Sequence, residues 1–585
     1  MKTYQKLWRL LVYRPWLTVA ALATWMLIAF VPVGLGLVAR AFFNALSGGA
    51  PAGAGLWWLV VLPVVVQSGR LAVTWVTVPL TVLQRFTISA LLSRNLFAHI
   101  LGRPGAAALD RSVGEAMICF RDDAEEVARF TSLIELLSVL GEVVAVVVTL
   151  VLMLRISVPV TVVPVLSLLG ITLIARAAAK RLGEYRSRSR AATGKVTGAL
   201  GEMLGMVQAV KLAGAEAAVT DHLRLLSDRR RQETVRDALF GELLRSIFLN
   251  TGNLGIGLVL LMAAGTMGSE RFTVGDFALF ASYVGRVGGF AGILGDLLAR
   301  YRQVAVSLDR MGALMVGAPA GALVTHAPIH LQGPLPELPQ PARQSRDRLT
   351  CLDARNLTCL HPQSGRGIRG VSLKVTRGSF TVITGRVGSG KTTLLRALQG
   401  LLPLQYGEIS WNGEAVTDPG RHFQPPRSSY TPQIPALFSA TLRENLLMGL
   451  PDHQSDLNSA IWSAVLEGDV SRLDQGLDTP VGPRGVKLSG GQVQRVAAAR
   501  MHVRDPELLI FDDLSSALDV ETEQILWQRL RARSNTTCLA VSHREAVLRA
   551  ADQIILLCDG RLEATGTWSQ LMAESDEFIR LQSHA

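Results

Sequence analysis

The 585-residue sequence predicts an all-α membrane domain with six spanning helices, followed by an α/β domain. Hydrophobic residues make up 49% of the chain and charged residues only 18%, and the long apolar runs are confined to the first half. In the second half, short Val, Ile and Leu runs alternate with helical stretches, the pattern typical of an α/β domain. The chain is also too long for one ordinary core, so at least two domains are expected.

Six apolar segments each approach the roughly 20 residues that a helix needs to cross about 30 Å of hydrocarbon. We expect these spans near residues 16–39, 56–80, 134–154, 157–176, 246–267 and 273–297. The first apolar segment is longer than that of a signal peptide, so we interpret it as a retained spanning helix. Residues 1–312 are therefore predicted to form the transmembrane domain.

The positive charge lies between the apolar spans. Residues 1–312 carry about 32 Lys and Arg against about 20 Asp and Glu, whereas the remainder carries about 27 of each. The long loops are rich in Arg and Lys and the short loops are not, which places the long loops in the cytosol. We therefore expect a multi-pass protein of the cell membrane, with both termini and the α/β domain cytosolic. This placement favours the lipid bilayer, and not nucleic acid, as a partner.

The long loops are themselves predicted to be helical. Leu83–Leu101 and Ala177–Leu212 lack proline and keep apolar residues at helical spacing. The membrane helices are thus expected to continue into the cytosol. The loop tips are expected near Ala106–Gly114 and Gly214–Asp221.

The composition changes after Arg310. Residues 313–348 are rich in Pro, Ala and Gly and are predicted to be a linker, and residues 349–585 are predicted to be the α/β domain. The five cysteines are odd in number and form no CxxC pair, which argues against a disulfide or metal framework.

A glycine-rich loop at residues 385–393 is the strongest motif in the chain. It follows the strand-like segment 380–384 and precedes the helix-like segment 394–398, the context that a phosphate-binding P-loop requires. Its glycines let backbone N–H groups surround phosphates, and the helix N-terminus adds a favourable dipole. The predicted nucleotide-binding residues are Gly385, Arg386, Val387, Gly388, Ser389, Gly390, Lys391, Thr392 and Thr393. Lys391 is expected to reach the β- and γ-phosphates of ATP, and Thr392 to hold Mg²⁺.

A second motif is the apolar strand Leu508–Phe511, which ends in Asp512 and Asp513. Such a run fits a buried parallel strand whose tip presents a carboxylate. We expect Asp512 to be a Mg²⁺ ligand beside the P-loop.

Between these two motifs lies the sequence Leu488-Ser-Gly-Gly-Gln492. Here the chain resembles the ABC ATPase family, whose signature is LSGGQ. The resemblance implies that Leu488, Ser489, Gly490, Gly491 and Gln492 cap ATP bound to an opposite subunit. It also implies that Gln433 is the glutamine that senses Mg²⁺, that Asp519 communicates across a dimer, and that His543 contacts the γ-phosphate.

The membrane half resembles the exporters with extended intracellular helices, so the resemblance covers nearly the entire chain. The segments 108–115 and 210–216 resemble the two regions that couple the membrane helices to the ATPase domains. This implies an ATP-hydrolysing half-exporter that uses ATP and Mg²⁺ and pairs with a second half-transporter subunit.

The sequence departs from the family at three places. His361 stands where an aromatic residue normally stacks on adenine. The loop Thr479-Pro-Val-Gly-Pro483 lacks the usual glutamate. Asp513 replaces the glutamate that polarises the attacking water, which retracts the carboxylate by one methylene, roughly 1–1.5 Å. A misplacement of about 1 Å can lower a rate on the order of a hundredfold.

In the family, an aspartate at the position of Asp513 with an intact signature is typical of the slow site of a heterodimer. We therefore expect this chain to be the degenerate-site half of a heterodimer. Two alternatives stay open: a homodimer in which Asp513 is catalytic, and an importer that reuses the exporter fold. A channel on the same scaffold is disfavoured because no pore-like ring of charges is visible. A soluble nucleic-acid ATPase is excluded by the six spans.

The transported substrate cannot be inferred from the sequence. Ionisable and amide side chains within the spans are candidate functional residues, because such groups are costly at membrane depth. They are Gln67, Arg70, Glu142, Asn250, Asn253 and Arg286. We expect Arg70 to face the protein interior or a cavity and not lipid.

Overall fold

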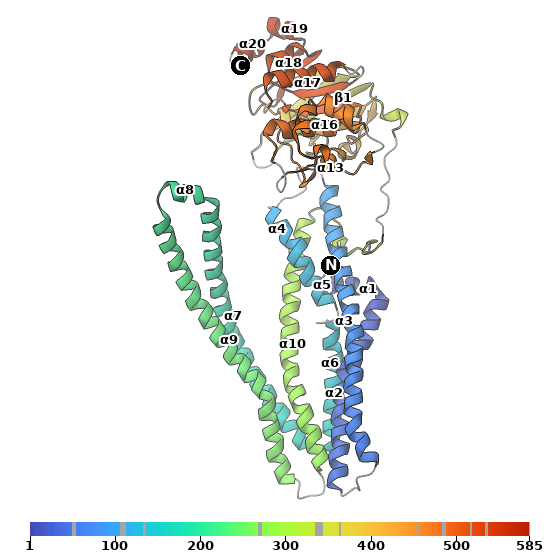
Figure 1. Cartoon of the computed structure of the whole chain (residues 1–585), viewed down its shortest axis with the longest axis vertical. Coiled ribbons are helices and arrows are strands. Elements are labelled where there is room, and N and C mark those ends of the chain that lie inside the picture. The colour runs from blue at the N-terminus through green and yellow to red at the C-terminus, as the bar shows by residue number, and fades with distance from the viewer. Residues whose placement is uncertain are drawn as a thin grey trace. The chain divides into compact units, whose positions relative to one another are not determined.

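The computed structural model describes residues 1–48, 54–103, 105, 113–132, 136–266, 272–333, 343–361, 364–452, 456–482, 487–514, 518–532 and 536–583. The chain divides into two compact units (Figure 1). One unit comprises Met1–His99 and Arg111–Gly333, and the other comprises Ile100–Asp110 and Pro334–Ala585.

The first unit is helical. Its helices are α1 (Thr3–Val12), α2 (Pro15–Ser47), α3 (Ala54–Gly102), α4 (Val113–Ile118), a π-helical turn (Cys119–Asp123), α5 (Ala124–Thr131), α6 (Leu136–Ile156), α7 (Val158–Gly205), α8 (Val207–Leu212), α9 (Glu216–Thr266) and α10 (Val274–Leu314). In the part of the chain that the structure describes, each of the six expected spans overlaps one helix, in the order α2, α3, α6, α7, α9 and α10. Within the described residues, α2, α3, α6 and α10 contain a stretch long and apolar enough to cross a membrane, and α7 and α9 contain shorter apolar stretches.

Helix α10 forms the centre of this unit, because it packs against α2, α6 and α9. The contact with α2 depends on a glycine. A Cβ atom at Gly36 would lie 2.3 Å from the ring of Tyr283, so only glycine admits this aromatic side chain. The Tyr283 hydroxyl donates a hydrogen bond to the Val33 carbonyl at 2.5 Å. Small residues permit this kind of close helix approach in membrane proteins.

The expected helical extension of the spans is present, with one correction. Helix α3 contains all of Leu83–Leu101, but Ala177–Leu212 is not one helix, because α7 ends at Gly205 and α8 follows as a separate helix. Met206 leaves the helical conformation at φ −118° and ψ 22°, next to a glycine that weakens the helix. The chain then turns at Gly214, with φ +60°, and α9 begins at Glu216. Most of the other expected tip, residues 106–112, lies outside the described residues.

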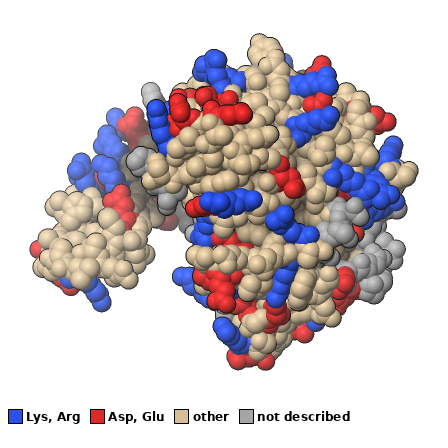
Figure 2. All heavy atoms as spheres, turned by 90° about the horizontal axis from the view of Figure 1, so that it is seen from above, with Lys and Arg blue, Asp and Glu red and all other residues tan. Residues whose placement is uncertain are grey.

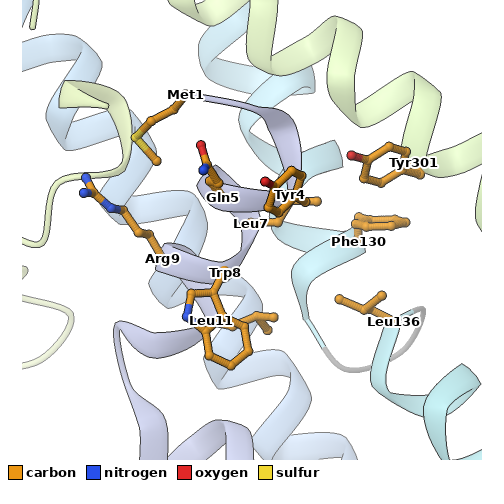
Figure 3. A pocket seen from close by; sticks show the side chains of 10 residues that line it. All are labelled: Met1, Tyr4, Gln5, Leu7, Trp8, Arg9, Leu11, Phe130, Leu136 and Tyr301. Carbon is orange, nitrogen blue, oxygen red and sulfur yellow. The ribbon is translucent and has the colours of Figure 1, made fainter. Parts of the chain in front are cut away.

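The N-terminal helix α1 was not predicted as a separate element. It buries Leu7 and Leu10 and exposes Trp8, which is 66% accessible. Side chains of α1 line a pocket of about 690 Å³ together with Phe130 and Tyr301 (Figure 3). An amphipathic helix with aromatic and basic side chains is typical of a membrane surface.

The segment expected to be a linker makes specific contacts at both of its described ends. Toward its start, the Asn95 side chain donates hydrogen bonds to the Leu323 and Thr325 carbonyls at 2.9 and 2.8 Å, within the helical unit. Toward its end, Arg343 pairs with Asp505 at 2.9 Å and with Glu507, within the second unit.

The second unit contains two main sheets. Its strands are β1 (Cys351–Leu360), β2 (Gly367–Thr376), β3 (Phe380–Thr384), β4 (Tyr406–Trp411), β5 (Glu414–Ala415), β6 (Ser428–Thr431), β7 (Ala440–Thr441), β8 (Pro480–Val481), β9 (Leu508–Asp512), β10 (Thr537–Val541), β11 (Gln553–Cys558) and β12 (Arg561–Gly566). One sheet has the order β2-β1-β4-β5 and is antiparallel. The other has the order β12-β11-β3-β10-β9-β6 and is parallel except for β12.

Short helices accompany these strands: α11 (Lys391–Leu398), α12 (Pro419–His422), α13 (Leu442–Leu447), α14 (Leu457–Ser463), α15 (Glu467–Arg472), α16 (Gly490–His502), α17 (Val520–Ala532), α18 (Glu545–Arg549), α19 (Trp568–Glu574) and α20 (Asp576–Ser583). Strands β3, β9 and β10 are buried throughout, as expected for the centre of a sheet that is covered on both faces.

The parallel sheet brings four motifs to one edge. Val541 of β10 pairs with Ile383 of β3 on one side and with Asp512 of β9 on the other, and Thr431 of β6 pairs with Phe511. The carboxyl ends of these strands therefore lie side by side. The segments that leave them are the glycine-rich loop, Asp513, the segment that contains Gln433, and the segment that contains His543.

Candidate nucleotide-binding site

The glycine-rich loop leaves β3 and enters α11. Gly385 has φ +143°, and a Cβ atom there would lie 2.2 Å from the Leu557 carbonyl oxygen. Gly388 and Gly390 also lie in the left-handed region, at φ +84° and +97°. Gly385 therefore has to be glycine, because any side chain there would clash with the Leu557 backbone. Ser389 is buried and Val387 is exposed, and Thr392 and Thr393 lie in the first turn of α11, which begins at Lys391.

The Lys391 ammonium group lies within this loop. Its Nζ atom donates hydrogen bonds to the carbonyls of Gly385 and Arg386 at 2.7 and 2.8 Å. Burial lowers the pKa of Lys391 below its ordinary value, and the nearby carboxylates of Asp513 and Asp512 oppose this shift. A lysine ammonium group held within a glycine-rich loop suits the binding of a polyphosphate.

Asp512, at the end of β9, is 1% accessible. Its Oδ1 accepts a hydrogen bond from the Thr392 hydroxyl at 2.9 Å, and its Oδ2 accepts one from the Tyr430 hydroxyl at 3.1 Å. Burial raises the pKa of Asp512, while these two hydrogen bonds lower it. Thr392 and Asp512 together supply hard oxygen atoms beside the phosphate loop, which fits Mg²⁺ held jointly by protein and phosphate oxygens.

Sequence reasoning missed Tyr430. Burial raises its pKa to about 12, with a further contribution from Asp512, so the hydroxyl stays protonated and able to donate near neutral pH. The contact depends on β6 lying next to β9, which the sequence alone does not reveal. The local sequence contains no clear signal for this role, because Tyr430 lies among polar residues in Arg427-Ser-Ser-Tyr-Thr431.

Asp513 follows β9 in the left-handed conformation, with φ +52°. Its Oδ2 accepts a hydrogen bond from Nε2 of Gln433 at 3.0 Å. Its Oδ1 is buried and has no hydrogen-bond partner within the described part of the chain. The structure thus brings Gln433, Asp512 and Asp513 together beside the P-loop.

The two candidate histidines are exposed and lie near the same edge. His543 follows β10 directly. His361 follows β1, and its backbone N–H donates to the Arg366 carbonyl at 2.8 Å. The same hairpin approaches the phosphate loop, because a Cβ atom at Gly390 would lie 3.3 Å from the Gly367 carbonyl oxygen.

The signature sequence begins α16. Ser489 is the N-cap: its hydroxyl accepts from the Gln492 backbone, and the Gln492 side chain accepts from the Ser489 N–H at 2.8 Å. This capping box satisfies two backbone donors at the helix start. Sequence reasoning missed Asp469 in α15, which accepts from Gln492 at 3.1 Å and pairs with Arg495 at 2.7 Å.

Other predicted positions have a structural role or lie partly outside the described residues. Asp519 caps α17 and accepts hydrogen bonds from the Thr522 backbone and hydroxyl, both at 2.8 Å. These hydrogen bonds lower the pKa of Asp519. Residues 515–517, next to Asp519, and Pro483 are not described. Arg386 of the P-loop pairs with Glu577 of α20 at 2.6 Å, a contact that sequence reasoning also missed.

The polar residues of the spans are partly paired. Arg286 of α10 forms a bidentate ion pair with Glu142 of α6, at 2.7 and 2.8 Å, and also donates to the Ala29 carbonyl at 2.6 Å. Asn250 donates to the Ser246 carbonyl at 2.9 Å. Arg70 lines two cavities of the helical unit, as the sequence predicts.

Basic and acidic side chains are interspersed over the face that Figure 2 displays. Exposed ion pairs also occur in the second unit, such as that of Arg443 with Asp452 and Asp478, at 2.8 and 2.9 Å. Exposed pairs of this kind contribute little to stability, about 0–1 kcal/mol each.

Two protein-family models match the chain. The model described as ABC transporter transmembrane region matches residues 16–288, and the model described as ABC transporter matches residues 368–516. Together they cover well over half of the sequence, and their order is that of the two structural units.

Individual proteins show the same similarity. The chain is 25% identical to the ATP-dependent lipid A-core flippase of Salmonella typhimurium, over 84% of this chain and 82% of that protein. It is 34% identical to the ABC-type transmembrane transporter verA of Clonostachys rogersoniana, over 40% of this chain but only 19% of that protein. Its fold matches a bacterial Atm1-family ABC exporter with ATP bound, with a TM-score of 0.76, 22% identity, and coverage of 98% of this chain and 99% of that chain.

The fold, the phosphate loop and the signature define an ATPase joined to a membrane permease. The chain belongs to the ABC transporter family. It is an ATP-hydrolysing transporter with the exporter fold, in which the transmembrane region and the ATP-binding domain form one polypeptide.

Proposed function

We propose that this chain is the slow-site subunit of a heterodimeric exporter, which uses ATP and Mg²⁺ to move a substrate out of the cytosol. The observation that carries the proposal is Asp513, an aspartate at the position where the family resemblance implies a glutamate. The chain would sit in the cell membrane with both termini and the ATP-binding domain in the cytosol.

In this proposal the residues at the sheet edge bind one nucleotide. Lys391 contacts the β- and γ-phosphates, and Thr392 and Asp512 hold Mg²⁺ with Gln433 beside them. The 2.9 Å contact between Thr392 and Asp512 supports this assignment. Two exposed histidines complete the nucleotide-binding residues of this chain: His361 stacks on adenine, and His543 contacts the γ-phosphate.

The geometry of Asp513 supports a slow site. The side chain is one methylene shorter than glutamate, and Gln433 holds one of its carboxylate oxygens at 3.0 Å. A carboxylate that is retracted and already engaged is poorly placed to orient a water molecule. A displacement of about 1 Å can reduce a rate on the order of a hundredfold.

The signature supports the second half of the proposal. Leu488–Gln492 is intact, and the capping box of Ser489 and Gln492 is formed, with Asp469 bracing Gln492. An intact signature on a chain with a weak catalytic carboxylate fits a subunit that completes the partner's fast site. The partner would be a second half-transporter with a catalytic glutamate.

A homodimer in which Asp513 is catalytic remains the second candidate, because a carboxylate is still present beside the P-loop. Import by the exporter fold is the other alternative. ATP-dependent uptake into inside-out vesicles would support export, and uptake only into right-side-out vesicles would support import.

Purification of the tagged chain from its native host tests the pairing. We expect a second, different half-transporter in equal amount. Recovery of an active transporter that contains only this chain would exclude the heterodimer.

A further inference from the structure

A cavity of about 420 Å³ lies among four helices of the transmembrane unit. Its polar lining consists mainly of Arg70 from α3, Glu142 from α6 and Arg286 from α10, and Trp25 from α2 adds an indole. Each of the three charged residues lies near the middle of its expected span. Binding sites near the bilayer midplane are typical of transporters.

The charges in this cavity do not cancel. Glu142 is fully engaged by Arg286, whose side chain is only 11% accessible. Within the described residues, Arg70 has no carboxylate within ion-pair distance, and its guanidinium therefore adds one uncompensated positive charge. A charged side chain at membrane depth usually has a partner or faces water, and it marks a functional site.

The unsatisfied hydrogen-bonding groups of the cavity are donors. Nη1 of Arg286 and Nε1 of Trp25 are buried and have no hydrogen-bond partner in the described part of the chain. Buried donors are almost always paired in proteins. Two such donors together with the free Arg70 guanidinium therefore call for a ligand that is rich in acceptor atoms and negatively charged.

The surroundings are apolar. Ile28 and Pro32 of α2 and Ile293 of α10 line the same cavity. Arg70 also lines a second cavity, of about 810 Å³, whose walls include Leu35, Val64 and Leu71. Gln67, Ser68 and Thr74 line the second cavity as well, so both cavities that Arg70 lines have polar and apolar walls. A guanidinium in such surroundings suits a molecule that has a charged head and an apolar body.

We propose that the transported substrate is an amphiphile with an oxyanion group, and that Arg70, Arg286 and Trp25 bind that oxyanion. Arg70 contributes the charge that the substrate neutralises, and Glu142 fixes the orientation of Arg286. Guanidinium groups bind phosphate and carboxylate oxygens through paired N–H donors, which suits this role. The inference rests on the transport activity proposed above.

The test uses the purified transporter, with its partner where one co-purifies, in nanodiscs of phosphatidylcholine. Calorimetric titration without nucleotide compares decyl phosphate, the uncharged decyl maltoside and inorganic phosphate, with empty nanodiscs as the blank. We expect decyl phosphate to bind more tightly than the other two probes on the order of tenfold or more. Equal affinity for decyl maltoside, which has the same alkyl chain and no oxyanion, would overturn the oxyanion assignment, and equal affinity for inorganic phosphate would overturn the amphiphile.

Variants assign the site. Arg70→Gln should weaken binding of decyl phosphate on the order of tenfold to a hundredfold, the effect of removing a hydrogen bond to a charged group. Arg155→Gln, at the exposed end of α6, is the matched control and should bind like the unaltered protein. Equal affinities in these two variants would contradict the proposal.

The variant Arg70→Lys distinguishes loss of the positive charge from a folding defect as the cause of weaker binding. It keeps the positive charge but loses the paired N–H donors, so it should weaken binding less than Arg70→Gln does. Loss as large as in Arg70→Gln, with an unchanged thermal unfolding midpoint, would overturn the electrostatic role. Because binding is measured without nucleotide, these outcomes are independent of Asp513 and of subunit pairing, and a transporter that binds but does not export would refute the proposed function alone.

Discussion

Replacement of Tyr430 by phenylalanine should weaken Mg²⁺ binding at this chain's nucleotide site. The hydroxyl donates to Asp512 Oδ2 at 3.1 Å, while Thr392 holds Oδ1 at 2.9 Å. Tyr430→Phe removes one of these two constraints and leaves the ring in place. Asp512 can then rotate away from the position in which it meets Thr392 and the metal.

The size of the effect follows from the contact. A hydrogen bond to a charged group contributes about 1.5–3 kcal/mol. The 3.1 Å length and the partial exposure of the tyrosine favour the lower end. A change of about 1.4 kcal/mol corresponds to a factor of ten in an equilibrium constant. The Mg²⁺ concentration for half-maximal nucleotide binding should therefore rise about tenfold.

Photolabelling with 8-azido-ATP measures this effect, because gel electrophoresis separates this chain from any partner. Labelling is followed as Mg²⁺ is titrated, and labelling in EDTA gives the metal-independent part, which should not change. Tyr406→Phe is the control, since Tyr406 is 74% accessible on β4. The same Mg²⁺ dependence in both variants would refute the role of Tyr430.

The effect should also be constant between pH 6 and 9. The pKa of Tyr430 is raised from 10.0 to about 12, so the hydroxyl keeps its proton throughout this range. A tyrosine whose folded-state pKa is raised loses its stabilising contribution only as the pH rises from about 10 toward 12. A tenfold effect that disappeared between pH 6 and 9 would point to another titrating group.

Two further predictions concern charged side chains. Lys391→Ala should greatly reduce 8-azido-ATP labelling of this chain, while the elution volume of the variant in size exclusion stays the same. Because the pKa of Lys391 is lowered, labelling of the unaltered chain should fall as the pH rises toward 10.5. The residual labelling of Lys391→Ala should not show this fall. Arg286→Met should destabilise the transmembrane unit by about 3–5 kcal/mol, because it leaves Glu142 largely buried without its partner. Adding Glu142→Gln should restore much of that loss, as measured by thermal unfolding in nanodiscs; a double variant as unstable as Arg286→Met would argue against the pair.

Local sequence was sufficient for the parts of the site that a strand–loop–helix unit builds by itself. The glycines at 385, 388 and 390 predict a phosphate loop because their backbone conformations exclude other residues. Asp512 was also predictable from consecutive residues, since an apolar run that ends in Asp indicates the tip of a buried strand. Ser489 and Gln492 likewise carry their capping box in four consecutive residues.

Contacts between segments that are distant in the sequence were not predictable. Tyr430 meets Asp512 only because β6 lies beside β9, and Arg386 meets Glu577 only because α20 returns to the phosphate loop. Glu142 and Arg286 were recognised separately as costly residues in spans, but no sequence pattern pairs positions 144 residues apart. The early end of α7 at Gly205 was missed because apolar spacing continues through Met206.

The most direct test of the slow-site account is the ATPase rate of two variants in the purified transporter. Asp513→Ala should retain most of the turnover, because the carboxylate that it removes is already poorly placed. Ser489→Arg should abolish most of the turnover, because the signature of this chain completes the partner's site. The two results belong together, since both follow from one geometry. A near-total loss of hydrolysis with Asp513→Ala would contradict the account and identify Asp513 as the catalytic carboxylate of a homodimer.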